Sequence, residues 1–385
     1  MARNPVLIVC VALGWWAAGS LPLVRVAPNR LMSGEPVFLS ALVQGGAWGA
    51  AALLLALSLA ALLPERRALH WLVAAMAACV PAALYAMAGA HAHAHTIAQA
   101  GSPLVRTALG AGFWGLVIFA SLMCLDAMAK LRLGVLPRVL VLVVLVTPLL
   151  AAIALGHGDE LSLLKEYANR SDVFAGAVWR HIQIVVLSVM ASVLIGMPLA
   201  WMLTRSMQLR KLVFPVLNVI QTIPSIALFG LLMAPLAWMA SHYPALAHAG
   251  ISGVGLAPAV LALLLYSLLP IVRSTVAGLE QVPMAVKTSA LAMGMGDLPL
   301  FWRVELPLAL PVILVGLRTA VVQTIGLAAV TALIGAGGMG VLVFDGLFSA
   351  ANELVVLAVL PIVLLALLAD ALFKVLAALL PGARA

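Results

Sequence analysis

The sequence predicts an all-α membrane protein that crosses the bilayer about ten times. Hydrophobic residues make up 65% of the 385 residues, charged residues make up only 9%, and the mean hydropathy is +1.19. A soluble protein cannot hide so much apolar surface, because its exterior has to be largely polar. The apolar residues also come in runs of about 20, the length that matches the hydrocarbon core of a bilayer. Composition and run length therefore both indicate a polytopic helical membrane protein.

We expect five spans before a polar segment in the middle of the chain and five after it. The first is interpreted as a membrane helix rather than a cleaved signal peptide, because further spans follow it. The expected spans cover residues 5–22, 41–63, 69–90, 108–129, 136–155, 178–203, 212–234, 255–277, 309–333 and 354–379.

The 21 Lys and Arg residues set the expected orientation. With the N-terminus inside, most of them fall on inner loops and ends, and a minority fall on outer loops. Cytoplasmic loops carry this excess of basic residues. We therefore expect both termini in the cytoplasm and residues 278–308 at the inner face. The net charge of +8 then reflects these loops rather than affinity for nucleic acid.

A polar stretch, GHGDELSLLKEYANRSDVF, marks the expected module boundary. Residues 156–177 form an extracytoplasmic linker between an N-terminal five-span accessory membrane module, 1–155, and a second module, 178–380. The first module has few polar residues within its spans, whereas the second carries most of the informative ones. No internal repeat is apparent, which disfavours a transporter built from two related halves.

The segment between the eighth and ninth spans does not cross the membrane. It reads KTSALAMGMGDLPLFWRVELPLALP, residues 287–311, and sets charges among small residues. Gly294 interrupts a first short helix, and Pro299 suits the start of a second one. Pro307 and Pro311 then open the ninth span. The pattern predicts a helix, a tight turn and a second helix, forming a docking element that moves with the spans on each side.

The spacing in this segment resembles the cytoplasmic coupling loop of ATP-binding-cassette (ABC) importer permeases. That family has Glu-Ala-Ala, three residues, Gly, nine residues and then Ile-x-Leu-Pro. The pattern falls here on Thr288, Ser289, Ala290, Gly294, Val304, Leu306 and Pro307. Thr288 stands where the family usually has glutamate, so the charge of that residue is missing. The backbone shape set by Gly294 and Pro307 is retained, and the resemblance implies an ATPase-coupling loop over 284–308.

Four further stretches are similar to permeases for glycine betaine, choline and related osmoprotectants. They are NVIQTIPSIALFG (218–230), LLLYSLLPIVRSTVAGLEQVP (263–283), VELPLALPVILVGLRTAVVQTIG (304–326) and LIGAGGMG (333–340). The resemblance covers about 178–380 and implies that the C-terminal five spans form a type I ABC importer permease core.

The family resemblance also implies the partners and the place of the chain. These are a second permease, identical or homologous, two cytoplasmic ABC ATPase subunits that bind ATP-Mg, and an extracytoplasmic substrate-binding protein. The complex would lie in the inner membrane and work by alternating access. The chain contains no G-x-x-x-x-G-K-[ST] phosphate loop. It is accordingly expected to be no enzyme, to have no catalytic residues and to bind no cofactor.

Polar residues within the later spans are candidates for a translocation path. A polar side chain in a span is costly unless it faces protein or water. The candidates either line a water-filled route or form hydrogen bonds between helices. We expect the set in the seventh span to share one helical face and to line the route. The candidates are Asn218, Gln221, Thr222 and Ser225 in the seventh span and Thr319 and Gln323 in the ninth.

The histidines of HAHAH, residues 91–95, are expected in an outer loop. His91 and His95 would share one helical face, but no carboxylate or cysteine joins them in the sequence, so no metal site is predicted.

Three alternatives remain open. The same machine with another small solute, such as an amino acid, fits the loop equally well. An ion-coupled secondary transporter would place carboxylates at mid-membrane, whereas Asp126 and Asp370 lie toward span ends. A membrane scaffold or sensor would leave the spacing of the 284–308 loop unexplained.

Overall fold

The computed structural model describes residues 4–29, 32, 34–99, 102, 104–248 and 250–380. It divides the chain into two compact units, Met1–Asn169 and Arg170–Ala385. The division falls within the segment 156–177 that we expected as a linker. Residues 1–3 and 381–385 belong to the expected cytoplasmic ends and lie outside the described residues.

Within the described residues, eight helices are long and apolar enough to cross a membrane. They begin with α4 (Arg67–Ala98), α5 (Ala111–Lys130), α6 (Val135–Ala154) and α8 (Ser171–Arg205), followed by α10 (Ser225–His242), α12 (Leu256–Glu280), α15 (Leu306–Ala328, extended at its start to Asp297) and α17 (Asn352–Leu379). The expected spans 5–22 and 41–63 contain shorter apolar helices, α1 (Pro5–Ser20) and α3 (Gly49–Leu62). A multi-pass helical fold is confirmed, with the expected count of ten holding approximately.

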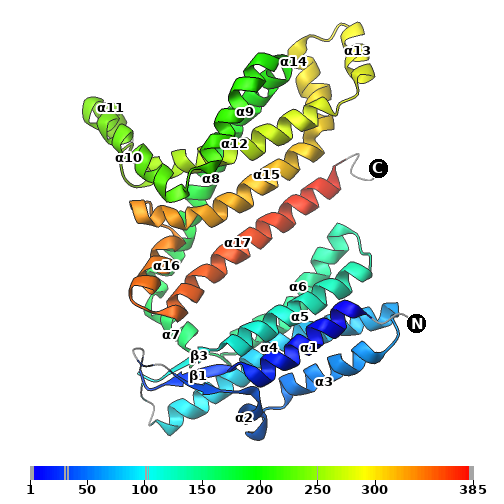
Figure 1. Cartoon of the computed structure of the whole chain (residues 1–385), viewed down its shortest axis with the longest axis vertical. Coiled ribbons are helices and arrows are strands. Elements are labelled where there is room, and N and C mark those ends of the chain that lie inside the picture. Colours follow the sequence, from blue (N-terminus) through cyan, green and yellow to red (C-terminus); the bar gives the residue numbers. More distant parts are fainter. Residues whose placement is uncertain are drawn as a thin grey trace. The chain divides into compact units, whose positions relative to one another are not determined.

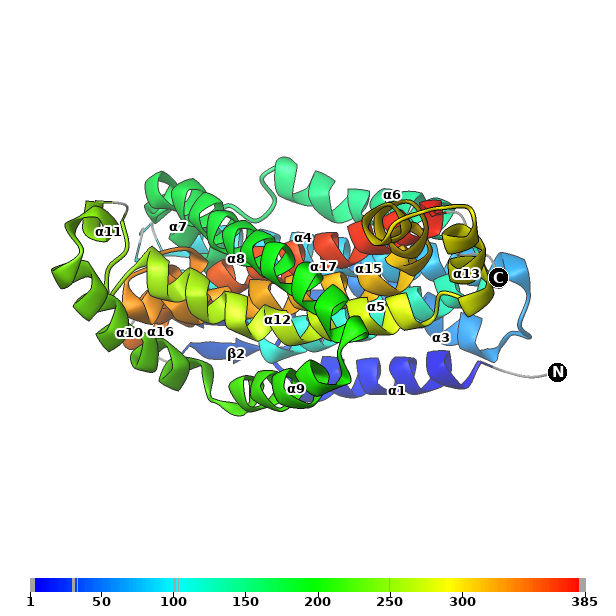
Figure 2. The ribbon, with the colours of Figure 1, turned by 90° about the horizontal axis from the view of Figure 1, so that it is seen from above.

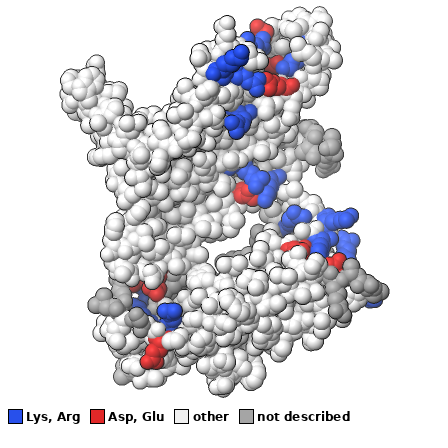
Figure 3. Space-filling model, viewed as in Figure 1, with Lys and Arg blue, Asp and Glu red and all other residues white. Residues whose placement is uncertain are grey.

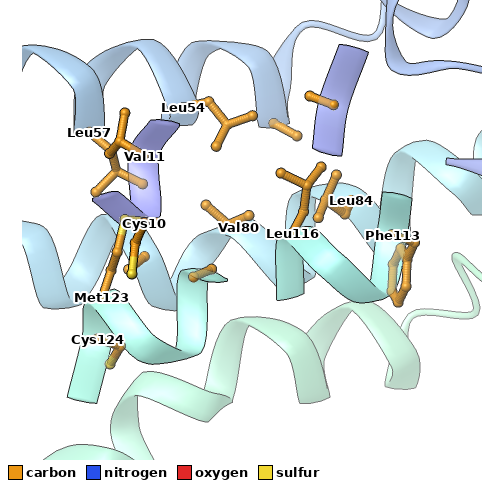
Figure 4. Packing of buried hydrophobic residues seen from close by; sticks show 14 of the residues in the cluster. Cys10, Val11, Leu54, Leu57, Val80, Leu84, Phe113, Leu116, Met123 and Cys124 are labelled. Atoms are coloured by element: carbon orange, nitrogen blue, oxygen red, sulfur yellow. The ribbon is translucent and has the colours of Figure 1, made fainter. Parts of the chain in front are cut away.

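The first unit is a bundle in which α4 packs against α3, α5 and α6, and α1 packs against α3 and α5 (Figure 1). Its core consists of aliphatic, aromatic and sulfur-containing side chains from four of these helices (Figure 4). Prominent among them are Cys10, Val11, Leu54, Leu57, Val80, Leu84, Phe113, Leu116 and Met123. Many of the remaining buried positions are alanine, which allows membrane helices to approach closely.

The first unit also contains a small antiparallel sheet that the prediction missed. Its order is β2-β1-β3, with β1 at Val24–Ala27, β2 at Glu35–Val37 and β3 at Arg106–Leu109. Each strand has three or four residues. A strand this short cannot show the alternation of apolar and polar residues that identifies strands in a sequence. The all-α prediction therefore holds for the spans but not for this connection.

The placement of the histidines 91–95 in a loop was wrong. Helix α4 runs through them to Ala98, and the ring centroids of His91 and His95 lie 6.4 Å apart on one face. Alanine alternates with these histidines, and its high helix propensity explains why the helix continues.

The second unit is organised around α12, the most buried of the eight long helices. Helices α8 and α15 pack along α12, and α15 also packs against α17 (Figures 1 and 2).

The remaining elements of the two units are shorter and connect the spans. They are α7 (Ser162–Asn169) at the end of the first unit, then α9 (Met207–Thr222), α11 (Pro244–His248), α13 (Met284–Ala292), α14 (Asp297–Leu300), the π-helical segment η1 (Phe301–Glu305), the 3-10 segment η2 (Val330–Ile334) and α16 (Met339–Phe348), with α2 (Leu39–Gln44) in the first unit.

The prediction of one continuous seventh helix over 212–234 was wrong. Helix α9 ends at Thr222, and α10 begins at Ser225. Pro224 has no backbone N–H to donate and disfavours helical backbone at the residue before it. Ile223 accordingly has an extended backbone, with φ −68° and ψ 129°.

The helix of the sixth span starts before the expected span itself. Helix α8 begins at Ser171 rather than near 178, so most of the expected linker 156–177 is helical, in α7 and in the first turns of α8.

Candidate functional site

The 284–308 loop follows the C-terminal end of α12 and consists of a helix, a turn and a second helix. Helix α13 ends at Ala292, and the chain then reverses at Gly294. The second leg starts with α14 and continues through η1 into α15 without a break. The loop is thus continuous with a spanning helix on its C-terminal side and joined by a short connection on the other.

Gly294 forms the turn because its backbone is left-handed, with φ +85°. The N–H of Gly294 donates to the carbonyl of Leu291 at 2.9 Å, and the N–H of Met295 donates to the carbonyl of Ala290 at 3.2 Å. These two bonds are those of a Schellman motif, which ends a helix with glycine in this conformation. The spacing between Ala290 and Gly294 in the sequence therefore has a local backbone cause.

The second leg of the loop packs over an apolar cluster at the ends of α8 and α12. Phe301 of η1 is buried and packs edge-on against Trp201 of α8, with the ring centroids 6.0 Å apart. Leu279 and Val282, from the end of α12 and the connection after it, and Ile313 of α15 complete the contact. The cluster binds the base of the loop to three spanning helices.

A buried carboxylate reinforces this contact. Glu305 is 5% exposed, and its Oε1 lies 2.9 Å from Nζ of Lys287 on α13. Lys287 also donates to the carbonyl of Leu279 at 3.0 Å. Arg205, at the end of α8, lies 3.9 Å from Glu305 and 3.2 Å from Asp297. We call Glu305, Lys287 and Arg205 the Glu305 clamp, since one buried negative charge joins α8, α13 and η1.

The predicted coupling residues differ in their environments. Ala290 is buried, Leu306 packs against the apolar cluster, and Val304 is half-buried, whereas Thr288, Ser289, Gly294 and Pro307 are exposed. The Thr288 hydroxyl donates to the carbonyl of Met284 within its own helix, at 2.9 Å. Glu305 was not among the predicted residues. Its acidic side chain among apolar neighbours was the available signal, but its partner Lys287 is brought close only by the fold.

The surface of the loop exposes large apolar side chains. On α13, Met284 is 75% exposed and Leu291 is also exposed, and Met293, which follows the helix, is 74% exposed. Flexible methionine side chains adapt well to a partner surface. Figure 3 shows Lys, Arg, Asp and Glu gathered around the α13 and α14 end of the second unit. The loop therefore combines a charged surrounding with an apolar contact surface.

The predicted path residues of the seventh span do not share one helix. Asn218 and Gln221 lie on α9, and both reach α12: the Asn218 amide oxygen accepts from Arg273 at 3.3 Å, and Gln221 Nε2 donates to the carbonyl of Tyr266 at 2.8 Å. Thr222 bonds back to its own helix at Val219. Ser225 begins α10 after the break, so the expected single face from Asn218 to Ser225 was wrong.

The path residues of the ninth span, Thr319 and Gln323, lie on α15 as expected. The Thr319 hydroxyl is exposed and donates to the carbonyl of Val315 at 2.9 Å, and Gln323 is half-buried. The structure places α9 and α15 separately against α12. Asn218 and Gln221 bond to α12, whereas Thr319 bonds within its own helix.

A buried row of hydroxyl groups joins α8, α12 and α15. Ser192 donates to the carbonyl of Leu264 at 3.1 Å, and the hydroxyls of Ser267 and Thr324 lie 2.8 Å apart. Interhelical bonds of this kind average about 0.6 kcal/mol in membranes. Ser267 was not singled out in the sequence, because a lone serine in an apolar run does not show which helix it faces.

One cluster of charged side chains joins α15 to α17. Arg318 donates to Asp370, and Lys374 lies 2.7 Å from the same carboxylate, one helical turn away. Partnering of this kind lowers the cost of charge within a membrane span.

Two family models match the chain. Residues 192–380 match the binding-protein-dependent transport system inner membrane component, and residues 2–164 match the N-terminal domain of the ABC transporter permease YehY. The osmoprotectant import permease protein OsmW of Salmonella typhimurium is 40% identical over 206 residues, covering 52% of this chain and 89% of that protein. The chain belongs to the ABC importer permease family.

Other relatives of this permease include the glycine betaine/carnitine/choline transport system permease protein OpuCD of Bacillus subtilis. It is 38% identical over 205 residues, covering 53% of this permease and 82% of OpuCD. A solved structure of the inward-facing MetNI methionine ABC transporter is similar over 54% of this permease and 97% of that chain, with 21% identity and a TM-score of 0.44.

Proposed function

We propose that this permease is the membrane-spanning subunit of an ATP-driven importer for glycine betaine, choline and related osmoprotectants. The observation that carries the proposal is the 40% identity to OsmW over nearly all of that protein. The similarity to OpuCD supports the same class of solute. These solutes are small and carry a quaternary ammonium group, and they would cross by alternating access through the second unit.

The 284–308 loop is the proposed coupling loop. It presents the exposed apolar side chains of α13, and its base is joined to α8 by Arg205 and to α15 through Glu305. A push on α13 would reach both helices, because the Glu305 clamp and the apolar cluster under Phe301 link them. The proposed coupling residues are Thr288, Ser289, Ala290, Gly294, Val304, Leu306 and Pro307.

The proposed complex contains a second permease, identical or homologous, two cytoplasmic ABC ATPase subunits and an extracytoplasmic substrate-binding protein. ATP-Mg is bound and hydrolysed by the ATPase subunits, and this permease neither catalyses a reaction nor holds a cofactor. Both termini and the coupling loop lie in the cytoplasm. Residues 1–155 form an accessory membrane module, and 178–380 form a type I permease core.

The proposed translocation path is lined by Asn218, Gln221, Thr222, Ser225, Thr319 and Gln323. Selectivity for the quaternary ammonium group lies mainly with the binding protein. Titration of glycine betaine into the purified permease alone should then show no micromolar binding, and such binding would contradict this division of roles.

The experiment that tests the function is reconstitution of the permease with its ATPase and binding protein in liposomes. ATP-dependent uptake of labelled glycine betaine or choline is expected, and Gly294→Arg should abolish it without preventing membrane insertion. Stronger uptake of an amino acid would indicate a different cargo. Uptake driven by a proton or sodium gradient without ATP would refute an ABC importer, and normal uptake by stable Gly294→Arg protein would refute the role of the loop.

A further inference from the structure

We propose that a cleft between α9 and α12 binds the phosphate group of an anionic phospholipid. The cleft has a volume of about 280 Å³ and is separate from the coupling loop. It is lined by Arg210 and Phe214 of α9 and by Arg273, Val276, Ala277 and Glu280 of α12. Its volume is slightly below the range of about 300–1,000 Å³ typical of small-molecule sites, which suits a headgroup.

Arg273 is the residue of the cleft that we expect to bind the anion. It lies seven residues before the end of α12 at Glu280, which corresponds to about 10 Å along the helix. Its side chain is exposed, whereas Val272 and Val276 beside it are buried. It donates to the neutral amide of Asn218 at 3.3 Å, a long hydrogen bond. A neutral amide does not balance a guanidinium charge within a membrane span, where such a charge is costly.

Arg210 is held at the other side of the same cleft. It forms an ion pair with Glu280, and its guanidinium lies 5.8 Å from the ring centroid of Phe214. Among the described lining residues, two guanidinium groups face one carboxylate, so the cleft keeps a net positive charge. The planar fork of arginine binds two phosphate oxygens at once. One phosphate group can therefore accept from Arg273 while Glu280 keeps Arg210 in place.

The surroundings of α9 favour a lipid over a soluble anion. The side of α9 opposite the cleft exposes Leu212, Val216 and Val219, which recur at helical spacing. An apolar face of this kind contacts acyl chains, and a positively charged cleft beside a spanning helix, at the end that the proposed function places in the cytoplasm, takes an anionic headgroup. Acyl chains would hold a lipid phosphate beside Arg273, whereas a free phosphate has no apolar part to hold it there.

The test measures lipid binding to the purified full-length permease in detergent. Short-chain phosphatidylglycerol is titrated while the thermal unfolding temperature is followed by tryptophan fluorescence. The wild-type protein should be stabilised by phosphatidylglycerol and not by phosphatidylcholine. Arg273→Gln should weaken this binding at least about tenfold, the effect of losing a charge-assisted bond. Arg273→Lys should lie between the two, because lysine keeps the charge but not the fork.

Lys211→Gln is the matched control, because it removes one positive charge from α9, the other helix of the cleft, at a residue that does not line it. It should bind phosphatidylglycerol like the wild type. Equal stabilisation by phosphatidylcholine, or unchanged binding in Arg273→Gln, would overturn the proposal. Millimolar inorganic phosphate or glycine betaine that reproduces the shift without lipid would also overturn it, assigning the cleft to a soluble anion or to cargo. The lipid readout needs no transport, so it stands or falls separately from the proposed function.

Discussion

Glu305→Gln tests how the 284–308 loop is fixed to the spanning helices. The substitution keeps the size of the side chain but removes the buried charge that faces Lys287 at 2.9 Å and Arg205 at 3.9 Å. Lys287 is left half-buried on α13 without its carboxylate partner. We expect the loop to loosen from α8 and α15 while the spanning helices stay folded.

The size of the effect follows from the contacts that remain. Removing one partner of a fully buried ion pair costs about 3–5 kcal/mol. Here Lys287 keeps its bond to the Leu279 carbonyl, and Arg205 keeps its contact with Asp297, so the loss is smaller. We expect about 2 kcal/mol, the value of one charged hydrogen bond. For a unit of this size that lowers the unfolding temperature by about 4–8 °C.

Thermal unfolding of the purified permease measures the loss, and uptake per ATP hydrolysed in liposomes measures coupling. Asp297→Asn is the matched control, because its ion pair with Arg205 is 67% exposed on the aspartate side and should contribute under about 1 kcal/mol. Combining Glu305→Gln with Lys287→Gln should cost less than the sum of the two single changes, since they share one interaction. An unfolding temperature and coupling ratio equal to those of Asp297→Asn would refute the clamp.

Three further predictions concern the turn, a helix crossing and one ion pair. Gly294→Val should reduce uptake far more than Gly294→Asn at equal membrane levels, because only glycine and asparagine readily accept φ +85°; equal uptake by both would contradict the turn geometry. Gly316→Ala should destabilise the protein by about 1–3 kcal/mol, because the added Cβ would lie 1.8 Å from a serine hydroxyl of α12. Gly326→Ala is the control, because its added Cβ meets open space. The unfolding temperatures of the two variants test this, and equal unfolding temperatures would refute close packing of α12 on α15. The hydrogen bond from Lys165 holds the pKa of Glu160 below its usual value. The stabilisation that this ion pair gives the folded protein should therefore be present above the pKa of Glu160 in the unfolded state. It should be lost as the pH falls through the pKa of Glu160 in the folded state. Glu160→Gln should flatten the pH dependence of the unfolding temperature on the acid side, and an unchanged slope would show that this pair contributes nothing.

The positions of the spans could be predicted because hydropathy acts residue by residue. A run of apolar residues prefers the bilayer whatever it packs against, so the runs were found despite errors at their ends. The same property explains the error at Pro224. Summed hydropathy over 212–234 is high on both sides of the proline, while the local break depends on the backbone of Ile223. The sheet was missed because β1 pairs with β3 from a distant part of the chain.

The shape of the 284–308 loop could be predicted for a local reason, whereas its contacts with the spanning helices could not. At Gly294 helix α13 ends: the N–H of Gly294 donates to Leu291 and the N–H of Met295 donates to Ala290, so every partner lies within six consecutive residues. The contact between Glu305 and Lys287 depends on how the two legs fold together. Likewise, Asn218 and Gln221 were identified as polar residues in a span, but their partners on α12 were not.

The sequence by itself determined that this chain crosses a membrane many times and carries a bent segment between two late spans, because transfer free energy and the backbone preferences of glycine and proline are local. Tertiary structure alone decided which charges and hydroxyls meet: the carboxylate beneath the bent segment, the row from Ser192 to Thr324, and the arginines facing one cleft. Such pairs form only where packing brings helices side by side, and the low polarity around them makes each pairing matter.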